Sequence, residues 1–429
     1  MRRRARCPKW FFVLLLVLGA VAAGRPVTAA AGDWPAALGL EFTGFLEARY
    51  GRRLVADPHQ RQASLAEGRL QLEADGDYDW LLLKFKGDLL ADGVTEENRG
   101  LLRELYLLTS PLEFADLKVG RQVLTWGTGD LLFINDLFPK DWQSFFCGRD
   151  SEYLKAPADA ARLSLFFDLV NLDLVYVPCF NPSTYITGER LSYWNPALGR
   201  LAGNHDTLHD ENRNRFFTDD EFAGRLYRTF GNLEAALYFY DGFWKTPEGL
   251  NPANGKLFFP RLRVLGASLR SHLLGGVGNL ETGYYDSRDD RDGDDPLVRN
   301  SEWRFLAGYE RELARDFTGG LQYYLEYMQD YANYKDSLPP GQHRADEYRS
   351  VFTLRLTRLL LDQNLTLSLF TYYSPTDEDA YLRPKASYKV TDDWLVEAGG
   401  NLFFGAHRYT FFGQFQDNTN LYLAMRRSF

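Results

Sequence analysis

The chain has 429 residues and a formal charge of -9 at pH 7, which argues against nucleic acid as a partner because an acidic surface repels phosphates. Beyond residue 31 no apolar run reaches about 18 residues, so the sequence offers no membrane-spanning helix there. Aromatic residues make up 15% of a sequence whose mean hydropathy is -0.35. This combination suits a β-barrel with an apolar exterior and a polar interior, and it also suits a secreted all-β protein.

Residues 1–31 have the organisation of a secretory signal. Five basic residues precede an apolar stretch, Phe11–Ala23, and small residues follow it. The simplest cleavage site is after Ala31, with cleavage after Ala23 as the alternative. We therefore predict a signal peptide over residues 1–31 and one exported domain over residues 32–429.

The exported part consists of segments in which apolar and polar side chains alternate, as they do in strands with two different faces. Eighteen such segments are predicted, at residues 41–52, 65–75, 80–90, 99–108, 117–125, 161–167, 172–178, 221–230, 233–244, 261–273, 277–287, 302–313, 317–331, 348–358, 365–373, 381–390, 394–404 and 420–429. Connections after even-numbered segments are short and those after odd-numbered segments are mostly longer, which is typical of short periplasmic turns and long outer loops. We predict an all-β fold, a transmembrane antiparallel β-barrel of about 16–18 strands, because boundaries inferred from one sequence are loose.

The last segment ends on an aromatic residue. Leu421, Leu423, Met425 and Phe429 share one of its faces. It resembles the terminal strand of Gram-negative outer-membrane β-barrels, although Arg427 stands where that pattern usually has an apolar residue. The resemblance implies a place in the cell outer membrane and pairing of the last strand with the first, which leaves no open edge in lipid. The alternative is an ordinary C-terminal edge strand.

Charged side chains in the strands should mark the inside of the barrel, because a charge at mid-bilayer on the lipid face costs about 2–4 kcal/mol. The pore-lining candidates are Arg69, Lys84, Lys86, Lys118, Arg121, Arg225, Arg304, Glu310, Glu326, Arg355, Arg383, Lys385 and Lys389, together with the acidic residues Glu73, Asp75, Asp88 and Glu397. Basic groups outnumber acidic ones in this set. Rings of charge set the selectivity of pores, so we expect a bias toward small anionic solutes.

One motif carries a family resemblance. Residues 117–130 contain Gly120-Arg121-Gln122, Trp126-Gly127 and Asp130, and Asp136 and Pro139 follow. This pattern resembles an uncharacterised family of proteobacterial outer-membrane porin-like barrels, some of them associated with export systems. It resembles the phosphate-selective porins more weakly, through their Gly-Arg-Gln strand. Both resemblances imply a porin-like barrel and leave the transported solute open.

Arg121 conflicts with strict alternation, which would place it on the lipid face beside Val119. A β-bulge at Gly120 would turn Arg121 inward, and we predict that bulge. The alternative is that Arg121 lies near the membrane interface and extends its charged end into water.

The connection at residues 126–160 is long and too apolar for a loop surrounded by water. We predict that it folds into the barrel as a constriction loop; packing against outer loops or another subunit is the alternative. Cys147 in this connection and Cys179 at the start of the next long connection, residues 179–220, lie in an oxidising compartment. We predict a disulfide between them, with two separate thiols as the alternative.

The sequence shows no signature of catalysis: nucleophile elbow, zinc motif and phosphate loop are all missing. His205 and His209 have a spacing that could bind a metal on a helix, but a solvated loop is the better interpretation. The aspartates of residues 286–295 lack the ordered spacing of a calcium loop. We predict no enzyme activity, no metal and no cofactor.

These observations predict an outer-membrane porin-like channel for passive diffusion of small solutes. Its expected partners are outer-membrane lipid, lipopolysaccharide and the solutes themselves, and a homo-oligomer is left open. The alternative is a closed scaffold or receptor barrel that serves an export system or sheathes a periplasmic electron-transfer partner.

Overall fold

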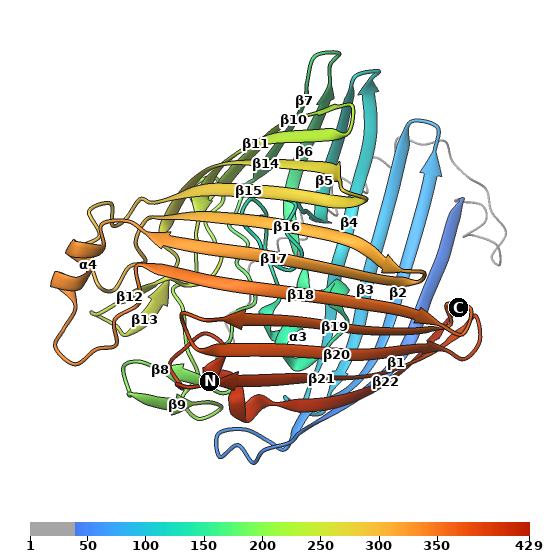
Figure 1. Cartoon of the computed structure of the whole chain (residues 1–429). Coiled ribbons are helices and arrows are strands. Elements are labelled where there is room, and N and C mark those ends of the chain that lie inside the picture. Colours follow the sequence, from blue (N-terminus) through green and yellow to red (C-terminus); the bar gives the residue numbers. More distant parts are fainter. Residues whose placement is uncertain (1–38) are drawn as a thin grey trace.

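The computed structural model describes residues 39–429, so the predicted signal peptide lies outside the described residues. Eighteen antiparallel strands form one closed sheet (Figure 1). The first strand, β1 (Leu40–Arg53), pairs with β2 (Ala63–Tyr78) on one side and with the last strand, β22 (Asn420–Ser428), on the other. Because first and last strands pair, the barrel has no open edge.

The remaining strands of the barrel follow one another in chain order, each paired with its neighbours. They are β3 (Leu81–Asp92), β4 (Glu97–Leu112), β5 (Ala115–Val123), β6 (Pro157–Phe166), β7 (Asn171–Val177), β10 (Glu221–Phe230), β11 (Leu233–Phe243), β14 (Arg261–Leu273), β15 (Gly276–Ser287), β16 (Glu302–Ala314), β17 (Phe317–Met328), β18 (Tyr348–Leu360), β19 (Leu365–Ser374), β20 (Asp379–Lys389) and β21 (Trp394–Gly405). Each corresponds to one predicted segment, so the prediction of an all-β antiparallel barrel is confirmed. Of the predicted 16–18 strands, the barrel has eighteen.

The outward face is apolar. Along β22, Leu421, Leu423 and Met425 are about half exposed, whereas Tyr422 and Ala424 between them are buried. The backbone of Phe429 exchanges two hydrogen bonds of 3.0 Å with Gly44, which extends the closure to the last residue. A closed sheet with such an exterior satisfies its backbone internally and suits a lipid bilayer. Within residues 39–429, helices long and apolar enough to cross a membrane are absent.

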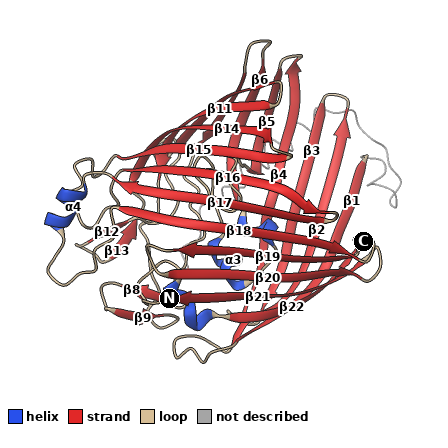
Figure 2. Ribbon diagram, viewed as in Figure 1, coloured by secondary structure: helices blue, strands red, loops and turns tan. Residues whose placement is uncertain are grey.

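The connections differ at the two ends of the barrel (Figures 1 and 2). One end has tight turns and the C-terminus, and we call it the periplasmic end. The other has long loops, which contain α4 (Tyr331–Ser337), η2 (Gly413–Asn418) and two small hairpins. The hairpins are β8 (Tyr193–Asn195) with β9 (Arg200–Ala202), and β12 (Gly249–Asn251) with β13 (Lys256–Phe258). These strands of three residues were not predicted, because alternation cannot be recognised over so short a stretch.

Candidate functional site

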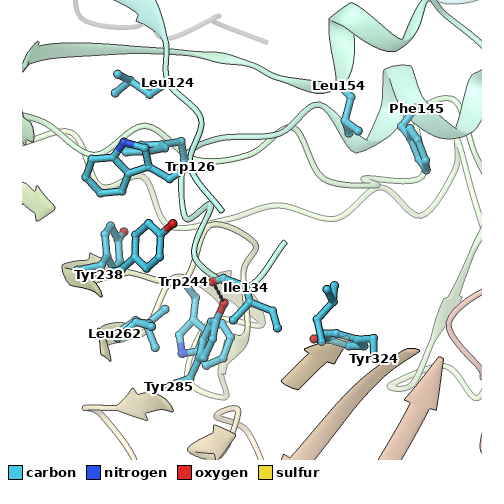
Figure 3. Close-up of a cluster of buried hydrophobic side chains, with 14 of the residues drawn as sticks. Leu124, Trp126, Ile134, Phe145, Leu154, Tyr238, Trp244, Leu262, Tyr285 and Tyr324 are labelled. Atoms are coloured by element: carbon cyan, nitrogen blue, oxygen red, sulfur yellow. Dashed lines mark hydrogen bonds between the residues drawn. The ribbon is translucent and has the colours of Figure 1, made fainter. Parts of the chain in front are cut away.

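The connection between β5 and β6, residues 124–156, lies inside the barrel and packs on its wall. Its apolar side chains and those of the wall form one buried cluster (Figure 3). Trp126 meets Phe138 edge-on at 5.0 Å between ring centroids and lies 6.1 Å from Tyr238 of β11. We call this connection the internal segment, and we divide it into a first lobe (residues 124–138), a neck (residues 139–141 with 154–156) and a second lobe (residues 142–153).

Glu281 of β15 holds the first lobe. Its buried carboxylate accepts the backbone N–H groups of Thr128 at 2.8 Å, Gly129 at 3.1 Å and Asn135 at 2.7 Å. The Asn135 side chain donates to the same carboxylate at 3.0 Å. Nearby, the Tyr285 hydroxyl donates to the Ile134 carbonyl (Figure 3). One wall carboxylate thus satisfies donors from both ends of the turn 128–135, and a buried charge is tolerated when it is hydrogen-bonded in this way.

Asp130, at the tip of the first lobe, is bound by the neighbouring strands. The Gln322 side chain of β17 accepts the Asp130 N–H at 2.7 Å and donates to the Asp130 carbonyl at 2.8 Å. Arg355 of β18 makes a two-pronged ion pair with the Asp130 carboxylate, with the Nη2–Oδ1 distance 2.7 Å. Tyr372 of β19 donates its hydroxyl to the Leu131 carbonyl at 2.8 Å. The wall therefore binds both the backbone and the Asp130 side chain at the tip of the first lobe.

The neck is a short antiparallel pairing of the two arms of the internal segment. The Asp141 N–H donates to the Leu154 carbonyl at 2.7 Å, and the Ala156 N–H donates to the Pro139 carbonyl at 3.1 Å. The Lys140 ammonium is buried beside the Asp136 carboxylate at 2.9 Å. Burial lowers the pKa of Lys140, and the charge of Asp136 opposes that shift.

The second lobe begins with a short helix, α3 (Trp142–Cys147). Asp141 caps its N-terminus by accepting the Ser144 N–H at 2.9 Å, and Gly148 ends it with a φ of 95°. Phe145 and Phe146 point into an aromatic cluster on the wall. Phe146 lies 5.5 Å from Tyr381, 5.9 Å from Phe403 and 4.9 Å from Phe415 of the last outer loop, all between ring centroids. Arg383 of β20 covers the Phe145 ring at 4.0 Å.

The second lobe then crosses to the first strands of the barrel. Arg49 of β1 donates to the Gly148 carbonyl at 2.8 Å. Arg149 binds the Glu67 carboxylate of β2 with a shortest distance of 2.6 Å. Beyond them, the Tyr153 ring lies under the guanidinium groups of Arg69 and Arg103, at 4.0 and 4.4 Å. The two lobes together contact the wall on β11, β14, β15, β17–β22 and β1–β4.

Four of the predicted pore-lining residues contact the internal segment: Arg355 and Arg383 as described, Arg69 through Tyr153, and Lys86 through Glu152 at 3.7 Å. The others lie on the wall beside other partners. Lys84 pairs with Glu73 and Asp75, Arg225 with Glu234, Arg304 with Glu302, Glu326 with Arg349, and Lys385 with Glu397, while Asp88 binds Arg69 and Lys118 covers the Tyr106 ring. Glu310 lines a hollow at the periplasmic end, and Lys389 is exposed there.

The wall presents different charges to the interior on different strands. In the pair Lys385–Glu397 the ammonium side chain is 31% exposed and the carboxylate 4%, and in the pair Arg162–Asp173 the values are 33% and 0%. The reverse holds for Lys84–Asp75, at 18% and 45%. The cation therefore faces the interior on β6–β7 and β20–β21, and the carboxylate does so on β2–β3.

Two predictions are wrong in the structure. The register of β5 is continuous through Gly120, so the predicted bulge is absent and Arg121 stays on the outward face, opposite to Gln122. Gly120 serves a close approach instead, because a Cβ there would lie 2.3 Å from the Leu105 carbonyl oxygen. Arg121 is neutralised by Asp159 of β6, its direct cross-strand partner, at 2.7 Å.

The predicted disulfide is the second wrong prediction: Cys147 and Cys179 are not bridged, and both thiols are buried. Cys147 packs against Leu65 of β2 and Tyr422 of β22, whereas Cys179 directly follows β7. Burial raises the pKa of the Cys147 thiol. Two cysteines on different walls cannot be joined without moving the backbone.

Several residues that hold the internal segment were not predicted, chiefly Glu281, Gln322 and Arg149. Glu281 and Gln322 lie on the polar faces of their strands, so alternation could have placed them inside the barrel. The sequence does not predict which of the interior polar residues contact residues 124–156, because those contacts depend on the fold of the connection itself.

Comparison with known proteins finds likeness in structure alone: no family model matches the sequence, and none of the curated proteins does. The crystal structure of Acinetobacter baumannii OccAB3 has a TM-score of 0.55 and 10% identity, and covers 91% of this chain and 99% of that one. Pseudomonas aeruginosa OccK5 (OpdH) gives 0.54 and 10%, with 91% and 97% covered, and OccK3 (OpdO) gives 0.54 and 12%, with 91% and 95%. At these identities the likeness establishes the barrel fold. The resemblance of residues 117–130 to a porin-like family stays a prediction.

Proposed function

We propose that the protein is an outer-membrane channel for passive diffusion of small solutes, and that the internal segment is its constriction. The observation that carries the proposal is the attachment of residues 124–156 to the inside of the wall by Glu281, Gln322, Arg355 and Arg149. Barrels of 16–18 strands are wide enough to hold a water-filled passage. A loop fixed across such a barrel sets the width of the passage and determines which wall residues a solute meets.

We propose a bias toward anions as a finer part of this function. Its support is the exposure of the cationic partner at Arg162 and Lys385, and the position of Lys118 over the Tyr106 ring at 3.7 Å. Two unit charges 4 Å apart interact by about 4 kcal/mol at an effective dielectric of 20. A few cations that face the passage are therefore enough to favour anions at low salt.

One observation favours the alternative of a closed scaffold or receptor barrel. The aromatic side chains of both lobes pack into a single buried cluster with the wall and with Phe412 and Phe415 of the last outer loop. Close-packed side chains leave no room for water, so this cluster excludes water from the part of the interior that it fills. On this reading the barrel would bind a partner by its loops and would conduct nothing.

Reconstitution into a planar bilayer separates the two. A folded barrel should run faster on a gel before boiling than after, and that fraction should be used. A channel gives discrete, stable current steps, and an anion bias gives a reversal potential of the corresponding sign in a salt gradient. Absence of current steps from heat-modifiable protein, at a protein density where a known porin conducts, would favour the closed barrel.

A further inference from the structure

A cluster of four arginines lies on the outside of the barrel near the outer rim. Arg261, Arg263, Arg288 and Arg291 line an open hollow of about 370 Å³ together with Asp241 and Leu262. The hollow spans the ends of β11, β14 and β15, which lie side by side (Figure 1). None of these residues belongs to the internal segment, so the cluster has no part in the proposed constriction.

The position of the cluster relative to the bilayer follows from the strand register. Phe239, Leu265, Tyr284, Trp303, Tyr327 and Tyr348 form one continuous row of cross-strand partners on the outward face. Tyr284 and Trp303 lie 5.0 Å apart, and Tyr327 stacks on Tyr348 at 4.7 Å. Aromatic side chains mark the level of the lipid headgroups in barrels. Because strands tilt by about 35–45°, a cross-strand row changes level along its length, so Phe239 and Tyr284, its members next to the cluster, give the level there.

The arginines begin one step beyond this row. Asp241, Arg263 and Asp286 are cross-strand partners and follow Phe239, Leu265 and Tyr284 by two residues toward the outer rim. Two residues of a strand span about 7 Å. Arg261 lies one step farther out, and its carbonyl accepts the Arg288 N–H at 2.9 Å. The cluster therefore lies just outside the aromatic row, where phosphates of the outer leaflet are expected.

The charges of the cluster are incompletely neutralised. Asp241 pairs with Arg263 at 2.7 Å, and Asp286 is shared by Arg288 at 3.7 Å and Arg291 at 3.4 Å. Among residues 39–429 no carboxylate forms an ion pair with Arg261, whose guanidinium lies 5.6 Å from the Phe243 ring. Arg263 and Arg291 are 43% and 55% exposed. A third carboxylate, that of Asp289, accepts the Arg261 N–H at 2.9 Å. Four guanidinium groups therefore face three carboxylates, and one positive charge is left for an anion.

We infer that this hollow binds the phosphate of an outer-leaflet lipid, namely the phosphorylated sugar headgroup of lipopolysaccharide. Guanidinium groups bind phosphate through two parallel hydrogen bonds, and they do so best where one side of the site is out of water. The apolar wall below, with Leu265 and Leu237 more than half exposed, accepts the acyl chains of the same lipid. The inference rests on the proposed outer-membrane location and does not require conduction.

Native mass spectrometry of the folded barrel in detergent tests the site. The variant Arg261→Gln, Arg288→Gln, Arg291→Gln keeps the Asp241–Arg263 pair. The matched control, Arg311→Gln, Arg315→Gln, Arg358→Gln, removes the same charge at the periplasmic end, where Arg315 lies in a turn and is 97% exposed. The probes are bisphosphorylated lipid A, lipid A without phosphates, and inorganic phosphate.

Wild-type and control barrels should retain bisphosphorylated lipid A at least about tenfold better than the variant, because each basic residue near an anionic surface contributes to binding. Lipid A without phosphates should bind all three proteins alike.

Equal retention of bisphosphorylated lipid A by wild type and variant would overturn the proposed phosphate site. Displacement of that lipid by millimolar inorganic phosphate would overturn the assignment of the ligand as a lipid and would show a site for free anions instead. If the triple variant fails to become heat-modifiable, Arg291→Gln alone should show a smaller loss of the same kind, and unchanged retention would again overturn the site.

Discussion

The two lobes of the internal segment are fixed to the same wall by different forces. Both lobes belong to one buried cluster, but the turn 128–135 of the first lobe depends on a few polar groups, chiefly Glu281, Gln322 and Arg355, which bind its backbone and the Asp130 carboxylate. The second depends on the aromatic rings of Phe145 and Phe146 packed among Tyr381, Phe403 and Phe415. Polar contacts can be removed one at a time, whereas an aromatic cluster loses packing as a whole. The first lobe should therefore move separately from the rest, and loosening the second should affect the whole segment.

Phe146→Ala should have the largest effect on stability. Phe146 is 3% exposed and touches rings from two strands and from the last outer loop, and truncating a buried Phe costs about 3–5 kcal/mol. The temperature at which the barrel loses heat-modifiable migration should fall. Phe404→Ala is the matched control: Phe404 follows Phe403 on β21 but is 51% exposed on the lipid side, so its truncation should change this temperature little. A similar fall in both variants would show that the cluster does not fix the second lobe.

Glu281→Ala should have a smaller and more local effect. It leaves the N–H groups of Thr128, Gly129 and Asn135 without their acceptor, and each buried donor left unsatisfied costs about 1–3 kcal/mol. We expect faster proteolysis within residues 126–136 and noisier current, with the barrel intact. Glu310→Ala, an interior carboxylate at the periplasmic end, is the control. Equal protection of the first lobe in both variants would contradict this account.

Removal of two cations that face the interior should shift selectivity more than stability, because Asp173 keeps its hydrogen bond from Ser164 and Glu397 keeps its ion pair with Arg49. Arg162→Gln with Lys385→Gln should move the reversal potential toward cations, because both cations are more exposed than their carboxylate partners. The shift should fade in concentrated salt, since charge is screened over about 10 Å at 0.1 M. Lys84→Gln, whose partner Asp75 is the more exposed group, should give a smaller shift. Arg355 and Arg383 are poor choices for this test because they also hold the internal segment.

Reducing agents should have no effect. Cys147 and Cys179 are not joined to each other, so thiol labelling of the denatured, unreduced protein should modify both. In the folded protein Cys147 should react slowly, because it is buried and its pKa is raised. Absence of labelling at either residue before reduction would show that a disulfide is present after all.

The strands could be predicted from the sequence, and the interior could be predicted only in part. Alternation over nine or more residues, as in β17 and β22, identifies the two faces of a strand because the lipid side excludes charge. The same rule placed Arg121 correctly on the outward face, and the added bulge at Gly120 was the error. The partners of the internal segment could not be predicted, because residues 124–156 have no repeating pattern from which their path across the barrel follows.

The proposed role of the internal segment is tested most directly by the single-channel conductance of the double variant Phe146→Ala, Glu281→Ala. This variant loosens both lobes and removes no charge other than that of Glu281. If residues 124–156 form the constriction, the double variant should conduct more than wild type, while the control Phe404→Ala, Glu310→Ala should not. A folded, heat-modifiable double variant with the wild-type conductance would contradict the proposal, because solutes would then pass without regard to this segment.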